Sequence, residues 1–127
     1  MDRISRKERE YIQDVLDKGF RSSSGSIYMN KLEKLFANKI GVKHAISFVN
    51  GTATMHATLE AMGIGIGDEV IVPPLTMSAT TFAVLQANAI PIFADVDRDT
   101  FTIDANDVAK KITNNTKAII PVSLYGL

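Results

Sequence analysis

Residues 50–53, Asn-Gly-Thr-Ala, have the types and order that suit phosphate binding. They follow an apolar run at 45–49 that predicts a strand, and they open an apolar helical pattern at 52–62. The first N–H groups of a helix lack internal partners and carry partial positive charge, so an anion is favoured there. Gly51 allows the backbone to approach a ligand closely, and Thr52 adds a hydroxyl donor. A helix cap at Asn50 or Thr52 is the simpler interpretation, and on these four residues alone it is the favoured one.

A second polar segment, PPLTMSAT at 73–80, lies between a predicted strand at 69–72 and a predicted helix at 78–88. In an open parallel sheet, ligands bind at the carboxyl ends of the strands. We therefore expect this segment and residues 50–53 to face one site. A helix cap at Ser78 or Thr80 is the alternative, and the two roles are compatible.

Three other patterns are better explained by structure than by chemistry. The glycines of GIGIG at 63–67 follow a helix and precede a strand, which is the reverse of a dinucleotide-binding loop, so they indicate a helix end and a turn. The acidic residues of ADVDRDT at 94–100 lack the glycine and glutamate of a calcium loop and indicate a polar turn. His44 and His56 have no catalytic partner at a recognisable spacing.

Strands and helices alternate over most of the chain, which is typical of βαβ units and an α/β fold with mainly parallel strands. The apolar strands do not alternate strictly with polar residues, so both sheet faces should be covered. Strands are predicted at 45–49, 69–72, 91–94 and 118–122, and helices at 5–18, 28–40, 52–62, 78–88 and 104–112. The predicted inward-facing residues of the last three helices are Met55, Leu59, Met62, Phe82, Leu85, Ala89, Val108 and Ile112, with Asp104 as the N-cap of the last.

The composition is that of one globular domain, and it argues against several classes of protein. The 127 residues have 46% hydrophobic content and equal numbers of acidic and basic residues, 14 of each, which argues against a nucleic-acid-binding protein. No apolar run is long enough to span a membrane, and the charged N-terminus does not match a secretory signal. Cysteine is absent, which predicts a cytoplasmic protein without disulfides.

The last residues, IIPVSLYGL, predict a strand without a covering helix, so we expect part of a larger domain.

Four motifs occur together in a specific order: NGTA at 50–53, GDEVIVP at 67–73, DVD at 95–97 and VSLYG at 122–126. From about Gly19 to Leu127, and densely from residue 41, the chain resembles the DegT/DnrJ/EryC1/StrS family of pyridoxal 5′-phosphate (PLP) enzymes. The resemblance implies the N-terminal portion of such an enzyme, with a partial large domain of the aspartate aminotransferase (type I) fold. It divides the chain into N-terminal helices with a substrate-side and dimer-side loop at 1–40 and an incomplete PLP-binding α/β domain at 41–127.

The resemblance also assigns a cofactor site and favours phosphate binding at residues 50–53. It implies that Thr52 and Ala53 bind the PLP phosphate through backbone N–H groups, with Gly51 allowing the approach. Met77 stands where the family commonly has an aromatic residue stacked on the pyridine ring, and Ser78 lines the same pocket together with Thr76. The substrate-side loop that the resemblance implies includes Phe20, Ser24 and Gly25.

The implied activity is transfer of an amino group, from glutamate or glutamine, to a keto group of a nucleotide-linked sugar by a homodimer. Such enzymes serve envelope polysaccharide and antibiotic sugar synthesis. No catalytic residue is assigned, because none of the nine lysines occurs in the context of the Schiff-base lysine and the pyridine-binding aspartate is missing. We therefore expect the 127 residues alone to be inactive. A PLP-dependent sugar dehydratase of the same family and a non-catalytic remnant remain as alternatives.

Overall fold

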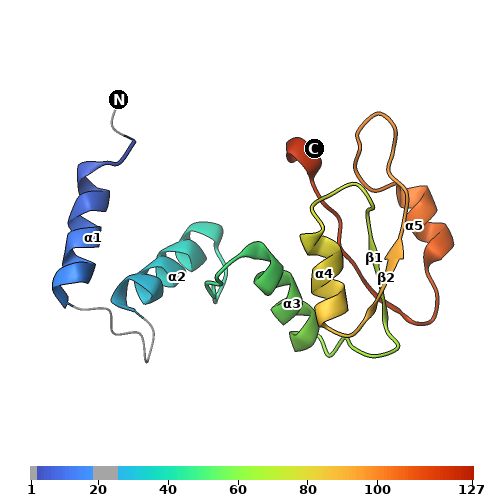
Figure 1. Cartoon of the computed structure of the whole chain (residues 1–127), viewed down its shortest axis with the longest axis horizontal. Helices are drawn as coiled ribbons and strands as arrows, with labels where there is room; N and C mark the ends of the chain where they lie inside the picture. Colours follow the sequence, from blue (N-terminus) through green and yellow to red (C-terminus); the bar gives the residue numbers. More distant parts are fainter. Residues whose placement is uncertain (1–2, 19–25) are drawn as a thin grey trace. The chain divides into compact units, whose positions relative to one another are not determined.

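The computed structural model describes residues 3–18 and 26–127, which divide into two compact units between Ser47 and Phe48. The first unit holds two helices, α1 (Arg6–Lys18) and α2 (Ile27–Ile40). The second unit holds the α/β elements (Figure 1). These are α3 (Gly51–Ala61), β1 (Glu69–Val72), α4 (Ala79–Gln86), β2 (Ile90–Phe93), α5 (Ala105–Lys111), β3 (Thr116–Ile119) and the 3₁₀ turn η1 (Leu124–Gly126).

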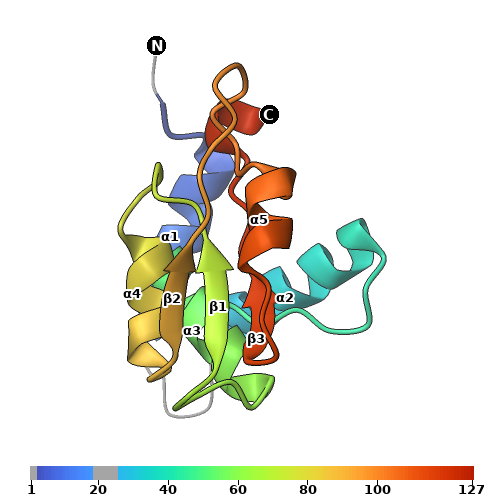
Figure 2. The ribbon, with the colours of Figure 1, turned by 90° about the vertical axis from the view of Figure 1, so that its right-hand side faces the viewer.

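The second unit is built on a parallel sheet in the order β2-β1-β3. Figure 2 shows α5 in front of this sheet and α4 behind it, so the sheet is the middle of three layers. The predicted strands at 69–72, 91–94 and 118–122 and the predicted parallel α/β architecture are confirmed, with shifts of strand boundaries.

The central strand β1 explains why its sequence is apolar without alternation. Val70 and Val72 belong to a core cluster with Leu59 of α3 and Val84 of α4. Ile71 points to the opposite face, where it packs with Val108 of α5. A strand covered on both faces needs apolar side chains at every position, and these three β1 residues are fully buried.

Two helix boundaries lie at residues of a type that favours a helix end or start. Gly41 closes α2 in the left-handed conformation, with φ of 76°, and Asp104 caps α5 by accepting a hydrogen bond from the Asn106 N–H. In the loop at 63–67, the Asp68 carboxylate accepts the Gly65 N–H, which confirms a turn in place of a dinucleotide loop. None of the helices in the described residues is long and apolar enough to cross a membrane.

The predicted strand at 45–49 is wrong: these residues form neither a strand nor a bridge. Strand formation requires a partner, and no described strand pairs with this segment. Its apolar residues are consequently open to solvent, with Ile46 73% and Val49 89% exposed. The segment is instead tied to α2 by Glu33, whose carboxylate accepts both the N–H and the hydroxyl of Ser47 at 2.8 Å. These two bonds lower the pKa of Glu33.

The predicted inward faces of the helices are correct only in part. Leu59, Ala89 and Val108 are buried as expected. The larger side chains predicted to share their faces are about half exposed or more, as is seen for Met62, Phe82, Leu85 and Ile112. On α4 the buried face is formed by small residues, Thr80, Ala83 and Val84, because a helix lying close to the sheet leaves little room for bulky side chains.

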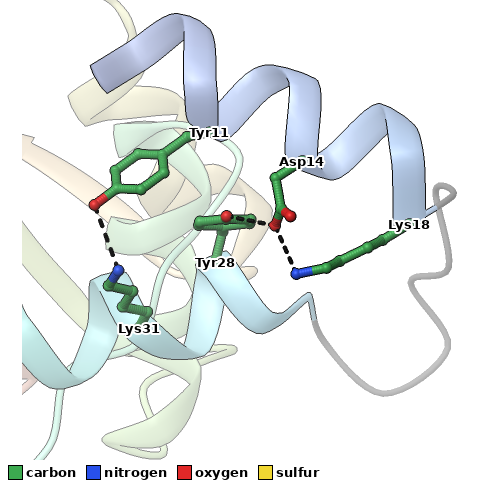
Figure 3. A network of polar contacts seen from close by, with 5 residues as sticks. All are labelled: Tyr11, Asp14, Lys18, Tyr28 and Lys31. Carbon is green, nitrogen blue, oxygen red and sulfur yellow. Dashed lines mark hydrogen bonds and ion pairs between the residues drawn. The ribbon is translucent and has the colours of Figure 1, made fainter. Parts of the chain in front are cut away.

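Within the first unit, α1 and α2 are joined by polar contacts between aromatic and charged side chains (Figure 3). The Asp14 carboxylate accepts hydrogen bonds from the Tyr28 hydroxyl at 2.6 Å and the Lys18 ammonium at 2.8 Å. The Lys31 ammonium donates to the Tyr11 hydroxyl at 3.4 Å and lies 4.9 Å from the centre of that ring. The hydrogen bond to Asp14 raises the pKa of Tyr28 to about 12, since the carboxylate stabilises the protonated phenol.

The burial of β1 predicts that two isoleucines contribute very differently to the free energy of unfolding. Ile71→Ala should lower the free energy of unfolding by about 2–5 kcal/mol, because it leaves a cavity between the sheet and α5. Ile66→Ala is the control, since Ile66 is 91% exposed and its loss should change stability by less than about 0.5 kcal/mol. Denaturant unfolding of the two variants measures both values, and equal effects would contradict the described core.

The Tyr28–Asp14 contact predicts a tyrosine that ionises unusually late. The folded pKa of about 12 lies above the ordinary value of 10.0. While Asp14 is ionised, this contact therefore stabilises the fold fully below pH 10 and is lost as the pH rises through the folded value. In Asp14→Asn the Tyr28 pKa should fall toward its ordinary value, because the carboxylate that holds the proton is gone.

Carbon-13 NMR of the ring carbon that bears the hydroxyl follows each tyrosine separately during a pH titration. Asp17→Asn is the matched control, because Asp17 bonds to Gln13 and not to a tyrosine. An unchanged Tyr28 titration in Asp14→Asn would show that the contact does not form in solution.

Candidate functional site

The candidate site lies at the edge of the sheet where the parallel strands end. Figure 1 shows that α3 and α4 run side by side in the same direction and both begin at this edge. The structure therefore brings two sequence-predicted segments to one edge: residues 50–53 at the start of α3 and residues 73–78 between β1 and α4. Both helices direct the positive end of their dipoles toward this edge.

The start of α3 is capped by Asn50, as the simpler interpretation of the sequence predicts. The Asn50 side-chain oxygen accepts the Ala53 N–H at 2.9 Å, and its backbone oxygen accepts the Thr54 N–H at 3.2 Å. The backbone N–H of Thr52 has no hydrogen-bond partner among the described residues. One of the two predicted phosphate donors is thus open, whereas the other already has a partner that an anion must share or displace.

The space in front of Gly51 is open. A Cβ atom built on this glycine would meet no heavy atom within 4 Å, and its φ is not in the left-handed region. The turn therefore does not require glycine for its conformation. A ligand can therefore approach the backbone here. These residues fit a phosphate group because they offer both free space at Gly51 and an open N–H donor at Thr52.

The loop after β1 is anchored at one end and open at the other. Pro73 is fully buried and fixes the exit from the strand. Met77, by contrast, is 76% exposed, and Ser78 stands at the N-cap of α4 without a side-chain capping bond. The Ser78 hydroxyl is therefore free to bond to a ligand, and the Met77 thioether presents an apolar, polarizable surface at the same edge.

The acidic segment at 94–100 forms the polar turn that the sequence predicts. Asp97 closes its own turn by accepting the N–H groups of Asp99 and Thr100, which lowers its pKa. Within residues 3–18 and 26–127, no group of three or more potential ligands is arranged to hold a metal ion. The predicted substrate-side residues Phe20, Ser24 and Gly25 lie outside the described residues, and their assignment stays a prediction.

The sequence predicts a cap at Asn50 but not that this cap uses a donor of the proposed phosphate site. A cap and a phosphate site are competing interpretations of the sequence, whereas in the structure the cap occupies one of the donors that the phosphate would use. The signal was present in the sequence, because an asparagine three residues before Ala53 is a standard capping arrangement.

The chain belongs to the DegT/DnrJ/EryC1/StrS aminotransferase family, whose sequence profile matches residues 2–127. One curated relative, the GDP-perosamine synthase of Escherichia coli O157:H7, is 45% identical over 123 residues, which are 97% of this chain and 34% of that protein. The chain thus spans about a third of the length of the curated relatives that it matches.

Solved structures share the fold. The 3-amino-5-hydroxybenzoic acid (AHBA) synthase superposes with a TM-score of 0.91 at 34% identity, over 98% of this chain and 33% of that one. The putative sugar aminotransferase Spr1654 from Streptococcus pneumoniae, in its PMP form, has a TM-score of 0.89 at 30% identity, over 97% of this chain and 31% of that one. That protein has also been solved in a PLP form. The fold of the chain is therefore that of part of a PLP-dependent aminotransferase.

The Asn50 cap predicts a measurable loss of stability. Asn50→Ala should lower the free energy of unfolding by about 1 kcal/mol, because the Ala53 N–H then loses its partner. Ser78→Ala, at the N-cap of α4, should have little effect, since the Ser78 side chain makes no capping bond. Thermal unfolding followed by circular dichroism compares the two, and equal losses would be inconsistent with a cap at Asn50 alone.

Proposed function

We propose that this chain forms the phosphate-binding part of a PLP-dependent aminotransferase that acts on a nucleotide-linked keto sugar. The observation that carries the proposal is the open backbone at Gly51 and Thr52, where α3 begins beside α4 at the carboxyl edge of the sheet. Membership of the aminotransferase family and the PLP and PMP forms of a solved relative support the choice of cofactor.

Each site residue has a role that its position allows. The N–H groups of Thr52 and Ala53 would donate to the phosphate of PLP, Gly51 would leave room for it, and the Thr52 hydroxyl would add a further donor. Met77 would lie against the ring, and the Ser78 hydroxyl would bond at its periphery. When bound, PLP supplies the electron sink for chemistry at the substrate carbon that carries the amino group.

The substrate proposal rests on the relatives and on the resemblance in the sequence. Two relatives carry the names GDP-perosamine synthase and spore coat polysaccharide biosynthesis protein, which support a sugar substrate and a role in polysaccharide synthesis. We propose glutamate or glutamine as the amino donor, a homodimer as the active assembly and the cytoplasm as its location. The nine lysines of the chain do not supply the covalent attachment of PLP, so we expect no transamination by these residues alone.

The sugar dehydratase of the same family differs from an aminotransferase in the residue at the covalent attachment position, which is histidine in place of lysine. Sequencing the coding region beyond the codon for Leu127 distinguishes the two. A lysine there supports the aminotransferase, a histidine supports the dehydratase, and a stop codon supports the non-catalytic remnant.

The phosphate site predicts a charge-dependent loss of binding. Ala53→Asp should weaken the binding of pyridoxamine 5′-phosphate by more than about tenfold, because a carboxylate then faces the phosphate at the start of α3. This ligand has no aldehyde and so does not react with surface lysines. Isothermal titration calorimetry on the 127-residue chain gives the dissociation constants.

Ala61→Asp is the matched control, since it adds the same charge at the opposite end of the same helix. Circular dichroism checks that both variants are folded. Equal affinities of the two variants would overturn the assignment of Thr52 and Ala53 to the phosphate.

A further inference from the structure

The methionines of the chain differ strongly in their access to solvent. Within the described residues, Met77 is the most exposed at 76%, followed by Met62 at 59% and Met29 at 40%, whereas Met55 is only partly exposed. Oxidants reach a thioether in proportion to its exposure. Of the methionines that the structure describes, Met77 is therefore the one most open to oxidation.

Met77 also belongs to the segment 73–78 that the candidate cofactor site includes. Its backbone oxygen accepts the Thr80 N–H at 3.2 Å, which ties the residue to the first turn of α4. Residue 77 thus lies just before α4, which begins at the same edge of the sheet as α3. Met62 ends α3, so it lies at the other end of that helix and serves as a natural internal comparison.

Oxidation changes the chemistry that Met77 offers to a ligand. A sulfur lone pair attacks one oxygen of hydrogen peroxide, the O–O bond breaks, and hydroxide leaves. The proton on the transferred oxygen passes to that hydroxide, so the products are the sulfoxide and water. Sulfur loses two electrons and the peroxide gains them. The side chain changes from apolar and polarizable to strongly polar, so it is a poorer surface for an aromatic ring.

We propose that Met77 is an oxidation-sensitive residue of the cofactor site. Its oxidation by a peroxide weakens the binding of the pyridine cofactor, and the bound cofactor in turn shields the thioether from the peroxide. This inference rests on the function proposed above. It adds a modification site and a reciprocal protection that can be measured without enzyme activity.

The first experiment follows oxidation at each methionine. The 127-residue chain is treated with hydrogen peroxide, with and without saturating pyridoxamine 5′-phosphate, and peptide mass spectrometry gives the sulfoxide fraction at each position over time. Met77 should oxidise before Met62, and the ligand should slow oxidation at Met77 alone. Equal rates at the two positions, or no protection of Met77, would overturn the inference.

The second experiment measures the consequence for binding. Peroxide treatment of the chain should raise the dissociation constant for pyridoxamine 5′-phosphate by roughly twofold to tenfold, the range that loss of a sulfur–aromatic contact would produce. In Met77→Leu the dissociation constants before and after peroxide should agree, because leucine retains the apolar bulk but cannot be oxidised. In Met62→Leu the response to peroxide should persist.

The outcomes separate this inference from the function on which it rests. If the untreated chain fails to bind pyridoxamine 5′-phosphate, the proposed cofactor site is overturned and the inference with it. If the untreated chain binds and peroxide leaves the affinity unchanged, only the inference is overturned. A loss of affinity that persists in Met77→Leu would place the oxidised group elsewhere.

Discussion

The burial of β1 between two helical layers is the constraint on which the second unit depends. Val70, Ile71 and Val72 are each 0% exposed, and full burial of such a side chain stabilises a fold by about 1.5–3 kcal/mol. Alternate side chains contact opposite layers, so the strand cannot slip by one residue without exchanging the two faces. The buried Pro73 then sets where the chain leaves the strand. The loop that carries Met77 and Ser78 is consequently placed by the core, although it contributes almost nothing to that core.

Much of this α/β arrangement could be predicted from the sequence because its signals are local. The apolar run at 69–72 corresponds to β1 in full, and Gly41 and Asp104 mark helix ends as their chemistry requires. The pattern of apolar residues was less informative about which face of a helix is buried. Phe82 and Leu85 are about half exposed because α4 contacts its neighbours through smaller residues, and spacing alone does not reveal how close two elements lie.

The error at residues 45–49 has a different physical origin. The composition of this segment suits a strand, but a strand is a property of two segments, and its backbone needs a partner that local sequence does not specify. In the structure, the hydrogen bonds from Ser47 to Glu33 take the place of sheet pairing on one side of the segment. Local sequence likewise does not reveal the contact of Asp14 with Tyr28 in the first unit. These two residues lie on different helices, and no periodic pattern predicts their proximity.

At the candidate site, the Ala53 N–H can donate either to the Asn50 side chain or to a phosphate oxygen, so capping and ligand binding have to be considered together. The Ala53 N–H donates to the Asn50 side chain, which contributes about 1 kcal/mol to the helix. A phosphate oxygen carries charge, and charge-assisted hydrogen bonds are roughly twice as strong as neutral ones, so a phosphate can displace the amide or share the donor with it. Asn50 therefore keeps the first turn of α3 formed while the open N–H of Thr52 remains available. On this view, the cap competes with an anion only for the Ala53 N–H, and it maintains the helix end that an anion site at residues 50–53 requires.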